Sequence, residues 1–144
     1  MSTKTFPNKK MLTLDWARRL ADAALAAAEM RQLDRLVIVI VDDTGILMHL
    51  LRQDGAEPAA VDIGIAKART AAIFRRPTRH WKGLLLEGKY WVLGMPNMTP
   101  IEGGQPILVD GQTIGGIGIA GASGVLDTEI GTAALVMLED ESAP

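Results

Sequence analysis

Two pairs of short apolar runs, each joined by a tight turn, constrain the fold of this chain most strongly. Residues 36–41 (LVIVIV) and 46–52 (ILMHLLR) are separated only by the turn sequence DDTG. Residues 106–109 and 112–120 are separated only by Asp110 and Gly111. Turns of this kind join antiparallel strands, whereas parallel strands need a crossover of about a dozen residues or more. The sequence therefore predicts two antiparallel hairpins and no Rossmann unit.

Helical patterns flank and separate the hairpins. Thr13 is the expected N-cap of a first helix whose inward stripe is Trp16, Leu20, Ala23, Ala24, Ala27 and Met30. A second helix is expected from about Ala59 to Phe74, ended by Pro77. Its buried side is expected to be formed by Ile63, Ala66, Thr70 and Ile73 or Phe74, with Asp62, Lys67 and Arg69 largely elsewhere.

Two further helices complete the pattern. Thr78 is expected to cap a third helix that reaches about Leu86, and a closing helix is expected from Val125 to about Glu139. Between them, residues 87–105 are rich in Gly, Pro and Asn, which favours a functional loop. Clustered strands with helices around them predict an α+β fold or a three-layer α/β sandwich with a mainly antiparallel sheet.

Composition excludes several functional classes. A chain of 144 residues suits one domain, and 48% hydrophobic content with a net charge of -2 is too apolar for disorder and too balanced for nucleic acid binding. The absence of cysteine excludes disulfides, a thiolate nucleophile and zinc ribbons. No apolar run approaches the roughly 20 residues of a membrane span, so we expect a cytoplasmic protein with no membrane partner. Residues 1–11 are expected to form a flexible arm.

The stretch FRRPTRHW, residues 74–81, carries the strongest chemical signal. Arg75, Arg76 and Arg79 supply guanidinium groups that bind carboxylates and phosphates. Cations at the start of the third helix oppose its dipole, which a bound anion would offset. A solvated surface or a subunit contact is the alternative. His80 is a candidate metal or heme ligand or proton carrier, whereas His49 within a strand is expected to be a partly buried structural residue.

Other candidates have ordinary structural alternatives. The sequence GIGIAG at 116–121 matches a dinucleotide fingerprint but lacks the second parallel strand, so Gly116 and Gly118 indicate close approach of a backbone, a helix or a flat ligand. Glu102 is either a general base or an ion-pair partner of the cationic stretch, and Ser123 is a turn or cap residue. Met95 and Met98 are soft heme ligands or fillers of a core or an interface.

Several of these blocks together resemble one known family. The segments DGA (54–56), KARTAAIFRRPT (67–78) and GGQPILVDGQTIGGIGIAG (103–121), with Asp127, are similar to the GlcG/HbpS family, also called the heme-degrading or PduO C-terminal-like domain. The resemblance implies one domain at 12–141 and a profilin-like or roadblock-like sheet of about five antiparallel strands sandwiched by helices, in the order α-β-β-α-α-β-β-β-α. It also implies homo-oligomers such as tetramers or octamers, and heme binding in some relatives. This chain lacks the cysteine that many relatives carry in the closing helix.

Three functional hypotheses follow. The first is a heme- or tetrapyrrole-binding module with a flat ligand on the glycine strand, propionates on Arg75, Arg76 or Arg79, and iron on His80. The second is an enzyme acting on a small carboxylated metabolite, in which Glu102, His80 or Asp127 moves a proton. The third is an oligomeric accessory subunit without chemistry of its own, anchored by Trp81, Tyr90 and Trp91.

Overall fold

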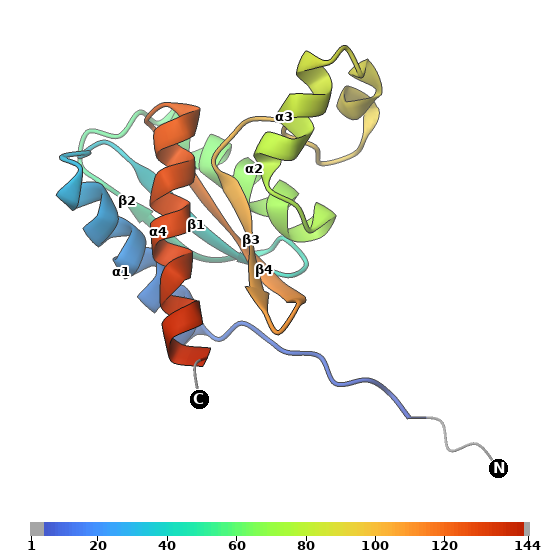
Figure 1. Ribbon diagram of the computed structural model, residues 1–144. Helices are drawn as coiled ribbons and strands as arrows, with labels where there is room; N and C mark the ends of the chain where they lie inside the picture. The colour runs from blue at the N-terminus through green and yellow to red at the C-terminus, as the bar shows by residue number, and fades with distance from the viewer. Residues whose placement is uncertain (1–4, 143–144) are drawn as a thin grey trace.

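The computed structural model of the protein describes residues 5–142. Its helices and strands follow the predicted order closely (Figure 1). They are α1 (Leu14–Met30), β1 (Val37–Asp42), β2 (Leu47–Arg52), α2 (Ala59–Phe74), α3 (Thr78–Leu86), the 3-10 helix η1 (Tyr90–Gly94), β3 (Gly104–Val109), β4 (Gln112–Ala120) and α4 (Gly124–Ser142). The four strands form one antiparallel sheet in the order β2-β1-β4-β3, which confirms the α+β class.

The sheet has four strands within the described residues, not about five. The segment that precedes β3 contains Tyr90–Gly94, which forms η1 instead of a strand. Gly88 with φ of +87° turns the chain just before it, and Pro96 follows it. A run this short, bounded by a turn and a proline, closes on itself more readily than it pairs with the sheet edge.

Turn chemistry produces both predicted hairpins. Asp42 Oδ1 accepts hydrogen bonds from the backbone N–H groups of Thr44 (2.8 Å) and Ile46 (3.1 Å), which closes the β1–β2 turn. Asp110 and Gly111 both have positive φ, at 49° and 77°, as a two-residue hairpin turn of type I′ requires. The two hairpins join through β1 and β4, so the most apolar strands lie at the centre of the sheet.

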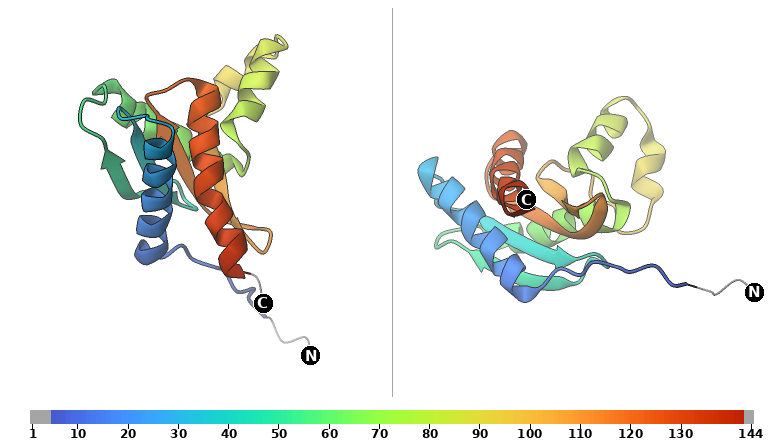
Figure 2. Two further views of the ribbon diagram at one scale, coloured as in Figure 1. Left: turned by 60° about the vertical axis from the view of Figure 1, so that its left-hand side comes forward. Right: turned by 60° about the horizontal axis from the view of Figure 1, so that its bottom comes forward.

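Helices cover both faces of the sheet, giving three layers (Figures 1 and 2). Ile38 and Ile40 of β1 pack with Leu20 of α1 and Ile130 of α4 on one face. Val37, Val39 and Val41 alternate with them and pack against the alanines of α2 on the other face. This alternation follows from the two-residue period of a strand, because both faces of a central strand are buried.

The buried side of α2 is only partly as predicted. Thr70 is buried, but the residues against the sheet are small, namely Gly64, Ala68 and Ala72, whereas Ile63 is 39% exposed and Lys67 is only 3% exposed. A Cβ atom added to Gly116 would lie 2.2 Å from the Ala68 carbonyl oxygen. Small side chains on both elements allow α2 to approach the sheet this closely. The face of α2 that carries glycine and alanine is therefore buried, rather than the face that carries large apolar side chains.

The predicted helix ends are partly confirmed. Thr13 caps α1, because its Oγ1 accepts a hydrogen bond from Trp16 N at 3.2 Å, but Met30 in the last turn is 85% exposed rather than part of the inward stripe. Thr78 does not cap α3; Pro77 holds the N-cap position, and the buried Thr78 hydroxyl bonds to Gly104 N (2.9 Å) and Gly104 O (3.4 Å). Thr78 therefore attaches α3 to the start of β3.

Of the predicted arm, residues 1–4 lie outside the described residues. Residues 5–13 have no helix or strand, and Lys9 and Lys10 form ion pairs with Asp43 and Asp110. The domain boundaries at 11 and 141 stay a prediction. Within the described residues, no helix is long and apolar enough to span a membrane.

Candidate functional site

A hollow of about 500 Å³ is lined by residues of α3, the loop before β3, α4 and Arg31 at the end of α1. Figure 1 shows how these elements are arranged. We call this cavity the α3–α4 hollow. Its apolar wall comes from Val125 and Ala133 of α4, and Thr128 and Thr132 on the same helix add hydroxyl groups. Its charged lining residues are Arg31, Arg79, Glu102 and Glu129. It therefore combines an apolar surface with a few polar groups, as small-molecule sites do.

The charged side chains that line the hollow differ in whether they have an ion-pair partner. Glu102 Oε1 accepts from Lys82 Nζ at 2.6 Å, and Arg31 Nε lies 3.7 Å from Glu129 Oε2. Arg79 makes no hydrogen bond or ion pair with any other residue in the part of the chain that the structure describes. An anion entering the hollow would thus meet a guanidinium that need not first lose a partner.

A buried ion pair supports the wall beneath the hollow. Lys67 Nζ donates to Asp127 Oδ2 at 3.0 Å and to the Ile119 carbonyl oxygen at 2.9 Å. Asp127 Oδ1 accepts from Ala122 N at 3.1 Å. Burial raises the pKa of Asp127, and the neighbouring Lys67 charge and these hydrogen bonds partly offset the increase. The pair ties α2 to β4 and α4, and neither side chain lines the hollow.

The loop that carries Glu102 packs closely against the Lys67–Asp127 pair. Gly103 has φ of +122°, and a Cβ atom there would lie 2.6 Å from Ile119 O and 2.9 Å from Lys67 Nζ. Gly124 similarly leaves room for the Glu102 side chain, since its own Cβ would lie 2.9 Å from Glu102 Cβ. The two glycines therefore let Glu102 line the hollow, where it forms an ion pair with Lys82, the residue directly after the cationic stretch.

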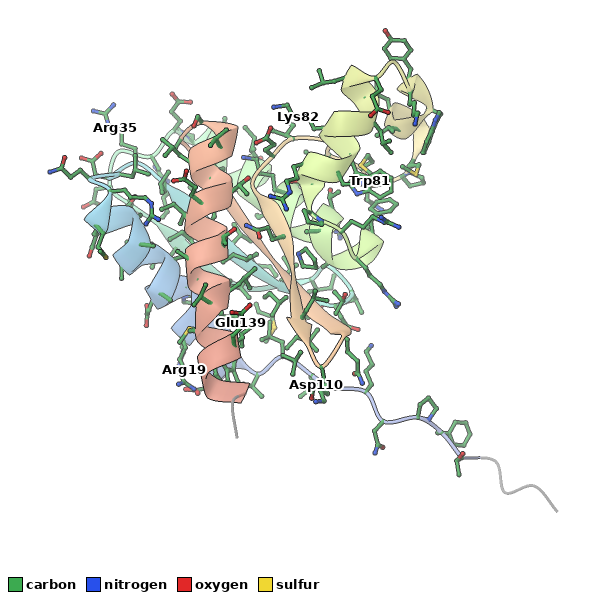
Figure 3. The ribbon with its side chains drawn as sticks, viewed as in Figure 1. Arg19, Arg35, Trp81, Lys82, Asp110 and Glu139 are labelled. Atoms are coloured by element: carbon green, nitrogen blue, oxygen red, sulfur yellow. The ribbon has the colours of Figure 1, made fainter. Side chains whose placement is uncertain are left out.

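His80 lies on a different flank of α3 from Arg79. Successive residues on an α-helix are about 100° apart, so Arg79 and Lys82 face α4 while His80 does not. The His80 ring is exposed and packs edge-on against Trp81, with ring centres 4.9 Å apart, and Trp81 packs in the same way on Phe74. Figure 3 shows Lys82 on the α4 side of α3 and Trp81 on the opposite side.

The flank of His80 has two unpartnered groups. Among the described residues the buried Trp81 Nε1 has no hydrogen-bond acceptor, and no hydrogen bond involves the His80 ring nitrogens. No group of three or more histidine or carboxylate side chains within the described residues is arranged to hold a metal ion. His80 is therefore available as a single ligand, not as part of a protein cage.

The remaining arginines of the stretch are divided between other surfaces. Arg75 ends α2 in the left-handed conformation, with φ of 58°, and lines a separate polar hollow of about 400 Å³ with Lys9, Asp43 and Gln112. Arg76 is exposed in the connection to α3. The structure therefore brings Arg79 and Glu102 together, but it does not gather the cationic stretch around one cavity.

The other sequence candidates occupy structural positions. The backbone of α2 fills the space in front of Gly116 and Gly118, so no flat ligand has room on that face of β4. Ser123 is a cap, as predicted, because its Oγ accepts from Leu126 N at 3.2 Å. Met95 and Met98 line a small hollow beside α2 with Asp62 and Arg69.

Sequence reasoning missed the contribution of α4 and of Arg31 to the hollow. Thr128 and Thr132 are four residues apart on α4, which is the spacing that places two side chains on one helix face. This spacing was the available signal. Nothing local could have linked it to Arg79, because the two segments are distant in the sequence and meet only through β3 and β4.

Known proteins provide close matches to this fold. A sequence model of the family described as "Haem degrading protein HbpS-like" matches residues 12–136. Protein GlcG of Escherichia coli K12 is 36% identical over 107 residues, covering 72% of this chain and 80% of that protein.

Two solved structures extend the comparison. A double mutant of HbpS from Streptomyces reticuli has a TM-score of 0.83 at 31% identity, covering 96% of this chain and 95% of that one. A structure described as a PduOC:heme complex has a TM-score of 0.79 at 25% identity, covering 88% and 94%.

Proposed function

Because the chain belongs to the HbpS-like family, we propose that it binds heme or a related tetrapyrrole, and that Arg79 in the α3–α4 hollow binds a carboxylate of this ligand. The relative that was solved as a PduOC:heme complex supports the ligand class. The unpaired Arg79 guanidinium, beside the apolar wall of Val125 and Ala133, is the observation that carries the proposal.

The residues around α3 fit heme in chemical type. Heme needs an apolar surface for the ring, cations for its propionates and an axial ligand for its iron. The hollow supplies the first two, whereas the exposed His80 imidazole lies on another flank of α3 and does not line the hollow, so a ring bound in the hollow takes its axial ligand from elsewhere. Bound heme would supply a redox-active iron, while the chain's own residues bind the carboxylates and orient the ring.

Hemin titration tests this proposal. We expect saturable binding, seen as a Soret shift, to weaken about tenfold or more in Arg79→Ala, because one charge-assisted contact is lost. Arg76→Ala is the matched control, since Arg76 is equally exposed in the same bend but does not line the hollow. His80→Ala should leave both the affinity and the Soret position nearly unchanged, because His80 does not line the hollow.

Two outcomes would contradict the proposal. Equal losses in Arg79→Ala and Arg76→Ala would mean that general surface charge, not the hollow, attracts hemin. The absence of any saturable shift would exclude heme as the ligand of the isolated protein.

A small carboxylated metabolite is the second candidate ligand. Arg79 and Glu102 line the same hollow, so Arg79 could bind a substrate carboxylate while Glu102 acts as a general acid or base. In that case a dicarboxylate such as succinate should raise the melting temperature of the protein without any heme signal, and Arg79→Ala should remove this effect. Asp127 is a weaker candidate for the proton-transfer role, because its carboxylate is buried in the pair with Lys67.

A further inference from the structure

A tight turn directly after η1 carries two methionines. Pro96 and Asn97 form this turn, and Asn97 has φ of 59°. Proline at the second position and a residue with positive φ at the third are typical of a type II β-turn, whose first and fourth Cα atoms lie within about 7 Å of each other. Met95 and Met98 occupy the first and fourth positions. The turn therefore brings the two methionines close together.

A buried hydroxyl group of α2 fixes this turn. Thr70 Oγ1 donates to the Asn97 carbonyl oxygen at 3.2 Å and accepts from Thr99 N at 3.1 Å. The Thr70 side chain has no exposed surface, so water does not compete for these hydrogen bonds. The backbone at Asn97 and Thr99 is thus held against α2 before any ligand arrives.

Both methionines line one small hollow between this loop and α2. It has a volume of about 280 Å³, and we call it the methionine hollow. Met48 and Met137 pack against the hydrophobic core, as methionines that fill gaps do, whereas Met95 and Met98 are half-buried and belong to neither core cluster. Their thioether sulfur atoms are therefore available as ligands.

The rest of the lining favours a soft cation of low charge. Asp62 and Arg69 are its charged residues among those described, so the charges of the hollow sum to zero. Asp62 makes no hydrogen bond or ion pair with any residue that the structure describes. The Arg69 side chain packs along Gly45 in the β1–β2 turn, where a Cβ atom on Gly45 would lie 2.8 Å from Arg69 Cγ. The Asp62 carboxylate can thus balance one added positive charge.

Thioether ligands are soft and uncharged, and among the first-row metals they select Cu(I). We propose that Met95 and Met98 bind one Cu(I) ion through their sulfur atoms, with Asp62 balancing its charge. No described residue lines both this hollow and the α3–α4 hollow, so the proposal does not depend on the ligand bound there.

Silver provides a direct test of the ligands, because Ag(I) is a soft monovalent ion that keeps one oxidation state in air. In protein with ¹³C-labelled methionine methyl groups, one equivalent of Ag(I) should shift the NMR signals of Met95 and Met98 alone. Met11 and Met30 are internal controls, since they are 78% and 85% exposed and equally free to meet the ion. Equal shifts at Met11 and Met30 would indicate adventitious thioether binding and overturn the proposal, as would unshifted signals throughout.

Competition with the chelator bicinchoninate, in anaerobic reducing buffer, measures the affinity for Cu(I) itself. Met95→Leu and Met98→Leu should each raise the dissociation constant about tenfold or more, because leucine keeps the apolar bulk and loses the sulfur. Met30→Leu is the matched control and should leave the dissociation constant unchanged. Full affinity in either Met95→Leu or Met98→Leu would show that the two sulfur atoms do not share one ion.

The role of Thr70 as a positioning residue has its own readout. Thr70→Val removes the hydroxyl that holds the turn and should weaken Cu(I) binding, whereas Thr70→Ser keeps the hydroxyl and should retain it. Equal binding by the valine and serine variants would contradict a turn held by Thr70.

The pH dependence separates thioether ligands from an imidazole. A thioether does not take up a proton near neutral pH, so the dissociation constant should change less than about threefold between about pH 8 and about pH 6. A site that included the His80 ring would weaken on acidification, because the ring becomes protonated. A loss of affinity at low pH that His80→Ala abolishes would therefore overturn the assignment.

Discussion

Lys67 and Asp127 are the least expected pair of side chains in this protein. Lysine and aspartate are rarely buried completely unless they are paired, and here they are 3% and 1% exposed. Their cost of desolvation is offset by their mutual contact and by hydrogen bonds to Ile119 O and Ala122 N. Each charge is therefore tolerated only because the other is present.

Removing one partner should consequently destabilise the fold strongly. We expect Lys67→Met to lower the free energy of unfolding by about 3–5 kcal/mol near neutral pH, because it leaves the Asp127 carboxylate buried and uncompensated. The double variant Lys67→Met with Asp127→Asn removes both charges and should recover a large part of this loss. Urea denaturation of the three proteins measures both effects.

The pH dependence of the single variant has a definite sign. Burial already raises the pKa of Asp127 above its ordinary value of 3.8, and losing Lys67 removes an opposing influence. A carboxyl group with a raised folded-state pKa favours folding when protonated, and this contribution is lost as pH rises through that pKa. The deficit of Lys67→Met relative to the double variant should therefore shrink between about pH 8 and about pH 5. A deficit that grows on acidification would show that Asp127 is not the destabilising group.

The packing of α2 on β4 depends on glycine rather than on large apolar side chains. The Gly64 carbonyl oxygen would lie 2.2 Å from a Cβ atom on Gly118, just as the Ala68 oxygen would from one on Gly116. The literal dinucleotide fingerprint in this strand is thus explained by the helix that lies against it. Only main-chain atoms and small side chains fit in the contact.

Alanine substitution at these glycines tests the close contact. Gly116→Ala should lower the free energy of unfolding by about 1–3 kcal/mol or more, because the added methyl group forces α2 away from the sheet. Gly83→Ala is the matched control, since Gly83 lies within α3 with nothing within 4 Å of an added Cβ. It should be neutral or stabilising by up to about 1 kcal/mol, since alanine favours a helix. Thermal melts that leave Gly116→Ala unchanged would exclude the contact.

The molecule consists of a compact three-layer body and a projecting part formed by α3 and η1 (Figures 1 and 2). Thr78 is the one buried residue of α3, and Val92 is the one buried residue of η1, within the described residues. Leu86, Tyr90, Trp91 and Leu93 are all more than half exposed. Few buried contacts hold this part, so it should open locally at a lower free energy than the sheet.

Hydrogen exchange should report this difference. We expect the backbone amides of residues 79–94 to exchange at least about tenfold faster than those of β1 and β4, which lie at the centre of the sheet. A ligand in the α3–α4 hollow should slow exchange in α3 first, since Arg79 lies in the first turn of that helix. Uniformly slow exchange in free protein would contradict a loosely attached projection.

Local sequence signals were sufficient to predict the helices and strands and part of the candidate site. The DDTG and DG turns, the Thr13 cap and the bounds of α2 were all recognisable, because turn geometry and capping depend on neighbouring residues. The clustering of the strands, together with the family resemblance, predicted the α+β class, which the structure confirms with four strands. Glu102 pairs with Lys82, the residue directly after the cationic stretch, and its alternative role as a general base stays a prediction.

Contacts between distant segments could not be read in this way. The central pairing of β1 with β4, the burial of Lys67 and the separation of Arg79 from Arg75, Arg76 and His80 all arise when α2, α3 and α4 take their places around the sheet. A charge is buried where a distant partner compensates it, and Arg79 lies beside a hollow only because the distant helix α4 supplies its other wall. Sequence spacing determines which side chains share a helix face, but tertiary packing determines which other elements that face contacts.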